Sequence, residues 1–179
     1  MTDNELDRLA LAAASGDERS LDQLLRHVRP RMMTVCSRML PHREDAEEAC
    51  QDALLQVARH IATFEGRSPF TTWTHTIATN SARMTYRALR RRAHERPAAD
   101  LVEPTDPRTT SVIAGTRLDL LDALDVVDGE QPELVPPFLL RDVCEMSYPA
   151  IADHLGVPVG TVKARIHHAR QRVRALLAR

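Results

Sequence analysis

The chain is poor in glycine, cysteine and lysine. Its 179 residues include six glycines, three cysteines and a single lysine, Lys163. Scarce glycine and the lack of alternating apolar residues exclude a sheet-rich fold. The cysteines are odd in number and form no C-x-x-C pair, which argues against a disulfide framework and predicts buried, reduced thiols. Basic charge therefore comes almost entirely from arginine, whose planar fork binds phosphate and carboxylate groups.

Long hydrophobic runs and enzyme motifs are also absent from the sequence. No apolar segment approaches the ~18–20 residues that span a bilayer, and the N-terminal stretch MTDNELDRLALAAASGDE is acidic where a signal peptide would be basic. We therefore expect a cytoplasmic protein without membrane insertion. The chain has no glycine-rich phosphate loop, no H-E-x-x-H and no G-x-S-x-G, and its histidines lack metal-ligand spacing. We expect no catalytic residue, no metal and no cofactor.

Apolar residues spaced three and four apart do recur along almost every long segment, and they predict an all-α protein. Pro30 is expected to bend or divide the second helix. Ser68 and Pro69 are expected to serve as the N-cap and first residue of a long helix, and Gly156 to end a short one. The expected helices cover residues 5–14, 18–40, 46–61, 69–92, 112–127, 138–146, 148–155 and 161–178. Before the 138–146 segment, the helix is expected to start at or just before Pro136.

The composition changes at residues 95–110, which contain three prolines and no apolar period. Such a segment predicts an extended linker. The chain is thus expected to form two small helical domains, residues 1–94 and 111–179.

Residues 147–169 match the spacing of a helix-turn-helix. Ala152 allows the two helices to approach closely, and Gly156 permits the positive φ of a tight helix end. From Gly156 to Arg179 the chain has six Lys or Arg residues and no acid. A helix with one apolar face and basic residues elsewhere fits the major groove of DNA. The candidate contacts are Thr161, Lys163, Ala164, Arg165, His167, His168 and Arg170.

A second basic cluster lies between Arg83 and Arg96, where six arginines accompany one acid. Four of the six aromatic residues of the chain fall nearby, within residues 64–86. Aromatic rings beside arginines can hold unstacked bases of a single strand. Packing inside the domain is the favoured alternative for Phe70 and Trp73. The candidate contacts are Phe64, Glu65, Gly66, Arg67, Ser68, Trp73, Asn80, Arg83 and Arg87.

Acidic residues form a stripe on the helix predicted over 46–61 and just before it. Asp45, Glu48, Asp52 and Leu55 follow steps of three, four and three, which places them on one outward face. The helix macrodipole alone accounts for acids in the first turn, but not for Asp52 or an exposed leucine. A leucine within an acidic stripe suits docking against a basic partner helix.

Two segments resemble the extracytoplasmic-function sigma factors of the sigma-70 superfamily. DAEEACQDALLQVARHIATFEGRSPFTTWTHTIATNSARMTYRALRRR is similar to their region 2, which typically reads D-A-E-D-x-x-Q-E followed by F-R-x-W-x-x-x-I-A-x-N. LLRDVCEMSYPAIADHLGVPVGTVKARIHHARQRVRALL is similar to their region 4, with its L-G-x-P-x-G-T-V-K-S-R-x-x-R-A-R hallmark. The two segments occur in the expected order, on either side of the expected linker.

The resemblance implies a transcription-initiation subunit that binds core RNA polymerase and promoter DNA. It implies that region 2 docks on the β′ clamp helices, that the β subunit is also a partner, and that an anti-sigma factor holds the chain inactive. The core-binding residues that it implies are Asp45, Glu48, Gln51, Asp52 and Leu55. It assigns the stretch from Phe64 to Ser68, with Asn80 and Arg83, to a base flipped from the −10 element. It assigns Thr161, Lys163, Ala164, His167 and His168 to the −35 element.

This chain departs from the family pattern on the expected base-reading face. Ala164 stands where the family commonly has serine, and His168 where it has arginine, so a hydroxyl and a fixed charge are missing. Histidine is largely uncharged at neutral pH, which predicts a pH-dependent contact. A stand-alone helix-turn-helix regulator, which binds duplex DNA without polymerase, is the alternative.

Overall fold

The computed structural model describes residues 2–95 and 112–178, and within these ranges it contains helices and no strand. The predicted all-α class is therefore confirmed. Apart from Glu95, the predicted linker lies outside the described residues. The long helices are α1 (Asp3–Ala14), α2 (Glu18–Met39), α3 (Arg43–His60), α4 (Phe70–Glu95), α5 (Val112–Glu130), α7 (Tyr148–Leu155) and α8 (Val159–Leu177). Short helical turns complete the chain: η1 (Ile61–Thr63), η3 (Pro132–Leu134), α6 (Val135–Phe138) and η4 (Leu139–Val143).

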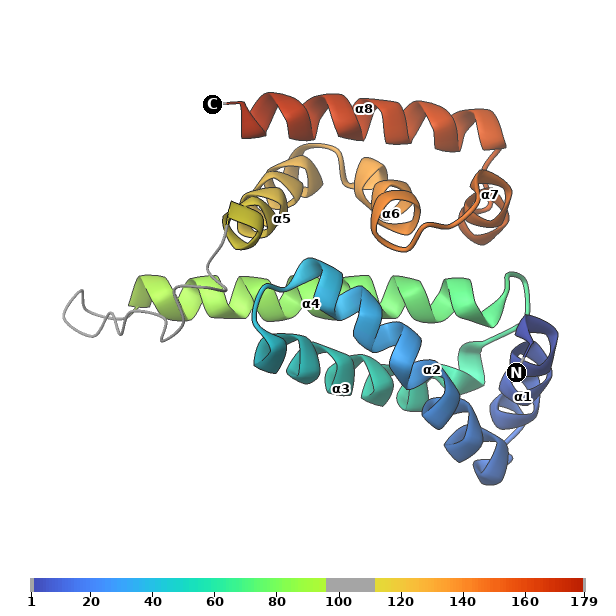
Figure 1. Cartoon of the computed structure of the whole chain (residues 1–179). Helices are drawn as coiled ribbons and strands as arrows, with labels where there is room; N and C mark the ends of the chain where they lie inside the picture. Colours follow the sequence, from blue (N-terminus) through green and yellow to red (C-terminus); the bar gives the residue numbers. More distant parts are fainter. Residues whose placement is uncertain (1, 96–111, 179) are drawn as a thin grey trace.

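Helices α1 to α4 form an N-terminal bundle, which occupies the lower half of Figure 1. From the sequence, Pro30 is expected to bend or divide the second helix. It does not divide it, because α2 runs through Pro30 without a break. Buried Val28 and Met32 on either side of the proline pack into the core and hold the helix together. The carbonyl of Pro30 also accepts a hydrogen bond from Thr34 Oγ1 at 3.0 Å.

The start of α4 differs from the prediction as well. Ser68 does not cap this helix, since its hydroxyl pairs with His154 at 3.0 Å. The backbone N–H of Phe70 donates instead to Asp7 Oδ1, at 2.7 Å, so the cap comes from α1. Pro69 precedes the helix, and its carbonyl accepts from the N–H of Thr72 at 2.9 Å. A side chain distant in sequence thus performs the capping that the local pattern assigned to Ser68.

Helices α5 to α8 form a C-terminal domain, drawn in the upper half of Figure 1. As predicted, a helix starts just before Pro136, at Val135. It continues as the π-helical turn η4 and ends at Val143, three residues earlier than expected. Glu145 follows with a positive φ of 60°, which no helix can accommodate. This turn leads directly into the N-terminus of α7.

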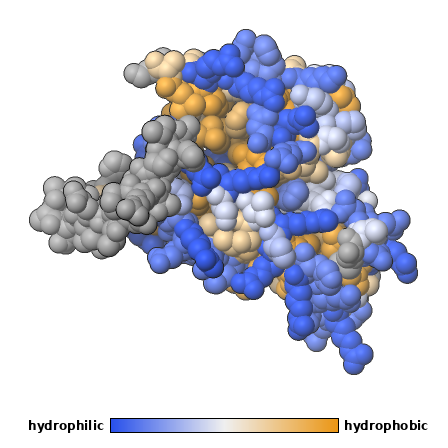
Figure 2. All heavy atoms as spheres, viewed as in Figure 1, coloured by the Kyte–Doolittle hydropathy of each residue, from blue (hydrophilic) through white to orange (hydrophobic). Residues whose placement is uncertain are grey.

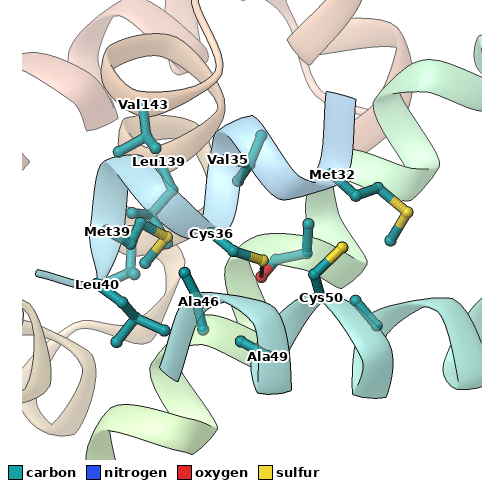
Figure 3. Packing of buried hydrophobic residues seen from close by; sticks show 14 of the residues in the cluster. Met32, Val35, Cys36, Met39, Leu40, Ala46, Ala49, Cys50, Leu139 and Val143 are labelled. Atoms are coloured by element: carbon teal, nitrogen blue, oxygen red, sulfur yellow. Dashed lines mark hydrogen bonds between the residues drawn. The ribbon is translucent and has the colours of Figure 1, made fainter. Parts of the chain in front are cut away.

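The two domains pack against each other and share a hydrophobic core. Figure 3 shows Leu139 and Val143 of the C-terminal domain beside Val35 and Met39 of α2, and all four are buried. Polar contacts add to this junction, since Arg38 donates to the carbonyl of Val143 at 2.7 Å. We call this packed state the closed arrangement.

The cysteines agree with the prediction of reduced thiols. All three are free, and Cys36 and Cys50 are buried between α2 and α3 (Figure 3). Burial raises the pKa of the Cys144 thiol to about 12, which keeps it protonated. Cys144 is therefore a poor nucleophile in the closed arrangement.

The surface in Figure 2 is mostly hydrophilic. Hydrophobic side chains gather where the C-terminal end of α8 meets α5, and Val126 and Leu177 are exposed there. None of the described helices is both long enough and apolar enough to span a bilayer.

Candidate nucleic-acid interface

The acidic stripe of α3 lies on the surface, as the sequence predicted. Helix α3 buries its alanines and Val57 against the bundle, which leaves the opposite face outward. Leu55 is 51% exposed and is among the most exposed large hydrophobic residues of the described chain. Asp45 is half-buried, and burial raises the pKa of its carboxyl, with a smaller contribution from neighbouring Glu48. The other members of the stripe, Glu48, Asp52 and Leu55, are exposed, and so is Gln51, the remaining predicted core-binding residue.

A hollow of about 580 Å³ lies between α3 and α4. Asp52 and His60 line it from α3, while Trp73, Asn80 and Met84 line it from α4. Asn80 is exposed, so its amide is available at the wall of the hollow. The structure thus brings Trp73 and Asn80, two predicted −10 residues, to one concave site beside the acidic stripe.

The loop before α4 divides its predicted site residues between core and surface. Phe64 is buried and packs edge-on against Phe70, with ring centroids 5.2 Å apart. Trp73 completes this aromatic cluster at 5.7 Å from Phe64. The favoured alternative, packing of Phe70 and Trp73 inside the domain, thus agrees with the structure, although Trp73 also reaches the hollow.

The exposed part of this loop contains Glu65, Gly66 and Arg67. Glu65 and Arg67 form an ion pair with each other. Gly66 has a φ of +70°, which favours glycine, and a Cβ at this position would lie 3.4 Å from a methyl group of Leu11. The loop is therefore held in one tight turn with its charged groups toward solvent.

Ser68, the last residue of the predicted loop site, is engaged by the C-terminal domain. The imidazole of His154 on α7 lies between two hydroxyls, with Nδ1 3.0 Å from Ser68 Oγ and Nε2 2.9 Å from Thr76 Oγ1. Thr76 also donates to the carbonyl of Thr72, at 3.2 Å, so its oxygen can accept from Nε2–H. In the neutral ring with its proton on Nε2, Nδ1 accepts from the hydroxyl of Ser68. Burial, with no charged neighbour, lowers the pKa of His154 below its ordinary 6.5.

Acidification is expected to loosen the closed arrangement through His154. A group whose pKa is lowered on docking binds its proton more readily when undocked, so docking weakens as pH falls through 6.5. Small-angle scattering should therefore give a larger radius of gyration at about pH 5.5 than at about pH 7.5. The variant His154→Gln should lose this dependence, and His27→Gln, an exposed histidine, should keep it. An unchanged pH response in His154→Gln would contradict the assignment.

Two predicted −10 residues of α4, Arg83 and Arg87, pair with carboxylates of α5. Arg83 is buried and lies 3.0 Å from Asp128 and 3.4 Å from Asp125. Arg87 donates to both carboxylates at 2.9 and 3.0 Å. Sequence reasoning missed these aspartates, although their spacing of three residues along one helix was a readable signal.

The helix-turn-helix has the predicted geometry. Ser147 caps α7 by accepting from the N–H of Ala150, and Gly156 ends it in the left-handed conformation with φ 65°. The buried face of α8 consists of Val162, Ile166, Ala169 and Val173. Of the predicted contacts, Lys163, Ala164, His167, His168 and Arg170 are exposed, and Thr161 and Arg165 are half-buried. The N-terminal half of α8 therefore presents its polar side chains to solvent.

Two arginines in the middle of α8 are tied to the domain itself. Arg170 grips Asp142 with two hydrogen bonds of 2.9 and 2.5 Å, which raise the pKa of its guanidinium. Arg172 pairs with Glu130. Within residues 2–95 and 112–178, no group of three or more His, Cys, Asp or Glu side chains is placed to hold a metal ion.

Comparisons with known proteins agree with this geometry. The family model "Sigma-70 region 2" matches residues 24–92, and "Sigma-70, region 4" matches residues 137–173. The chain is 32% identical to the ECF RNA polymerase sigma factor SigE of Mycolicibacterium smegmatis over 180 residues, which cover 95% of this chain and 67% of that protein. It is 31% identical to SigM of Mycobacterium tuberculosis, covering 94% of this chain and 83% of that one.

The fold also matches a solved structure, that of CnrH in complex with the cytosolic domain of CnrY. The TM-score is 0.54 at 24% identity, and the match covers 96% of both chains. The two family models in order along the chain, together with relatives above 30% identity over most of their length, decide the classification. The chain belongs to the extracytoplasmic-function sigma factors of the sigma-70 family, the RNA polymerase subunits that direct transcription initiation at promoters.

Proposed function

We propose that this sigma factor divides its contacts between two domains, residues 1–94 for core polymerase and the −10 element and residues 111–179 for the −35 element. The observation that supports this division is the exposure of Asp52, Asn80 and Lys163, which lie on different helices of the two domains. Asp52 lies on the acidic surface proposed for core polymerase, Asn80 in the hollow proposed for a base, and Lys163 on the basic helix proposed for duplex DNA. The chemistry of RNA synthesis is left to the polymerase, with which the chain would work in the cytoplasm.

The acidic stripe of α3 is the proposed contact with the β′ clamp helices. Its carboxylates provide complementarity to a basic helix, and Leu55 provides an apolar anchor that becomes buried on docking. Leu55 is 51% exposed, so its side chain is available to a partner helix. Asp52 and Leu55 lie one turn apart, so both reach the same partner surface.

The hollow between α3 and α4 is the proposed site for an unstacked base of the −10 element. Asn80 offers an amide that can both donate and accept, and the exposed edge of Trp73 offers a stacking surface. The turn that contains Gly66 lies in the loop before α4 and would follow the sugar-phosphate backbone of the DNA strand. Base flipping costs a few kcal/mol, so the hollow must act together with core polymerase and the −35 contact.

The N-terminal half of α8 is the proposed reader of the −35 element in the major groove. Lys163, His167 and His168 are exposed there, while Arg170 and Arg172 are held by acids of their own domain. Base reading therefore depends on few side chains, two of them histidines. We further propose an anti-sigma factor as a partner, since CnrH, a structural relative, was solved with the cytosolic domain of CnrY.

Reconstitution with core polymerase tests the proposed function. The purified chain should convert bare core polymerase into an enzyme that initiates at discrete promoters, which sequencing of the transcripts would identify. Tight binding to a palindromic duplex without polymerase, and no initiation with it, would instead favour a stand-alone regulator.

Replacement of His168 by alanine is expected to weaken binding to the preferred −35 duplex by roughly 1–3 kcal/mol and to relax preference at one base pair. A base contact loses more on its own sequence than on others, which competition among duplex variants measures. Arg174→Ala is the comparison, because Arg174 is exposed further along α8 and a phosphate contact there would weaken all sequences equally. Equal losses on every sequence would show that His168 contacts phosphate.

A further inference from the structure

Three arginines of α4 face three aspartates of α5 along the junction between the domains. The arginines are Arg83, Arg87 and Arg90, and we call Asp122, Asp125 and Asp128 the aspartate ladder. The pairs run in opposite directions along the two helices, from Arg90 with Asp122 at 2.5 Å to Arg83 with Asp128 at 3.0 Å. Arg87 bridges the middle, 2.9 Å from Asp125. Every member of the ladder is therefore matched to an arginine.

The ladder pairs each of these arginines with a carboxylate, and it buries Arg83 while Arg87 and Arg90 stay partly exposed. The side chain of Arg83 is only 9% exposed, and its Nε has no hydrogen-bond partner among the described residues. Arg87 keeps 40% exposure, but its two aspartates hold it and raise the pKa of its guanidinium. Burial opposes ionisation of Asp128, yet the hydrogen bonds from Arg83 and Arg87 outweigh it, so the pKa of Asp128 is lowered. These are strong, oriented pairs rather than chance surface contacts.

The ladder has the chemistry of a nucleic-acid backbone. Aspartates three residues apart lie about 4.5 Å apart along a helix, so they form a regular row of anions. An arginine fork binds carboxylate and phosphate through the same donors and in the same bidentate geometry. The N–H donors that hold an aspartate are therefore not available to a phosphate at the same time. The ladder and a DNA strand compete for the same donors on this face of α4.

We propose that α5 is an internal competitor of nucleic acid, whose aspartate ladder keeps the arginine face of α4 from DNA until the two domains separate. This inference rests on the proposed function, because it concerns the regulation of the −10 surface. The hollow with Asn80 stays open in the closed arrangement, whereas Arg83 and Arg87 are withheld. Separation of the domains would release the arginines in one step, so −10 binding becomes conditional on the open arrangement.

Neutralising the ladder tests the competition. The triple variant Asp122→Asn, Asp125→Asn and Asp128→Asn keeps the shape of the side chains and removes their charge. Binding to fluorescent oligothymidine without polymerase is followed by anisotropy over a range of salt concentrations. We expect at least about 10-fold tighter binding than wild type at low salt. The slope of log affinity against log salt should steepen by about two, since each phosphate contact on a single strand adds about 0.7.

A matched variant controls for net charge, which alone raises affinity for DNA. Glu18→Gln, Asp22→Asn and Glu133→Gln together remove the same three charges from exposed positions away from the junction. A gain no larger than that of this control would overturn the proposal. If the triple variant fails to fold, Asp122→Asn with Asp128→Asn leaves Asp125 to neutralise buried Arg83. This double variant should give an intermediate gain, and equality with a two-charge control would likewise overturn the proposal.

Initiation by the wild-type chain with core polymerase is measured separately. If the wild-type chain initiates but the ladder variants bind DNA no better than their controls, the aspartates only join the domains. The proposed function would then stand. If the ladder variants bind DNA more tightly than their controls but the chain does not initiate, α5 competes with nucleic acid on a surface that serves another purpose. The two failures are thus distinguishable.

Discussion

Replacement of Asp52 by arginine is expected to abolish promoter-directed transcription by the reconstituted enzyme. Asp52 lies in the middle of the acidic stripe, one turn from exposed Leu55. Reversal of its charge places like charges against a basic partner helix, which costs several kcal/mol and corresponds to at least about 100-fold weaker association with core polymerase. The measurements are co-migration with core polymerase and transcript yield from the same preparation.

The fold should survive this substitution, because Asp52 is exposed and surface changes of this kind alter stability by about 0.5 kcal/mol or less. Glu133→Arg is a matched control, since Glu133 is an exposed acid of the C-terminal domain, far along the chain from the stripe. It should bind core polymerase as the wild type does. Undiminished transcription by the Asp52 variant would remove the stripe from the polymerase interface.

The predicted helices follow from apolar spacing, because each buries one face and needs no other information to be recognised. The long helix α3 and the turn at Gly156 illustrate this, since both depend on residues within one or two turns. Errors arose where a distant side chain replaced a local one. Asp7 caps α4 in place of Ser68, and no pattern in residues 64–72 could have revealed it.

The candidate site shows the same division between local and distant causes. The exposed faces of α3 and α8 follow from periodicity, so Asp52 and Lys163 lie where the sequence placed them. The state of Arg83 does not follow, because an arginine on a helix surface is normally solvated. Its burial depends on how the C-terminal domain packs on α4, which is a property of the whole chain. Sequence identified the arginines, and only the structure identified their partners.

The junction between the domains combines two kinds of contact with different sensitivities. The pairs of Arg83 and Arg87 with α5 are ion pairs, and salt screens their exposed members. The contact of His154 with Ser68 and Thr76 favours the neutral ring, because burial lowers the pKa of His154, and it therefore responds to pH. Both withhold residues assigned to the −10 surface. Opening of the junction would therefore expose these −10 residues, which are covered in the closed arrangement.

The aromatic cluster where the loop joins α4 contains a purely structural ring, Phe70, and a ring that also reaches the hollow, Trp73. Phe70 is fully buried, with ring centroids 5.2 Å from Phe64 and 5.5 Å from Trp73. Phe70→Ala is expected to lower the free energy of unfolding by about 3–5 kcal/mol, since truncation leaves a cavity where the loop joins the helix. For a chain of this size the melting temperature should fall by about 6–20 °C, measured by circular dichroism.

Trp73 should behave differently, because it is only partly buried and one edge lines the hollow. Trp73→Leu keeps most of the apolar contact, so it should change the melting temperature much less than Phe70→Ala while weakening binding to a −10 single strand by about 1–3 kcal/mol per base lost from stacking. Phe70→Leu is the matched change at the buried position and should leave strand binding intact. If Trp73→Leu binds the strand as wild type does, the ring only packs against Phe64 and Phe70, and the hollow must recognise its base through Asn80.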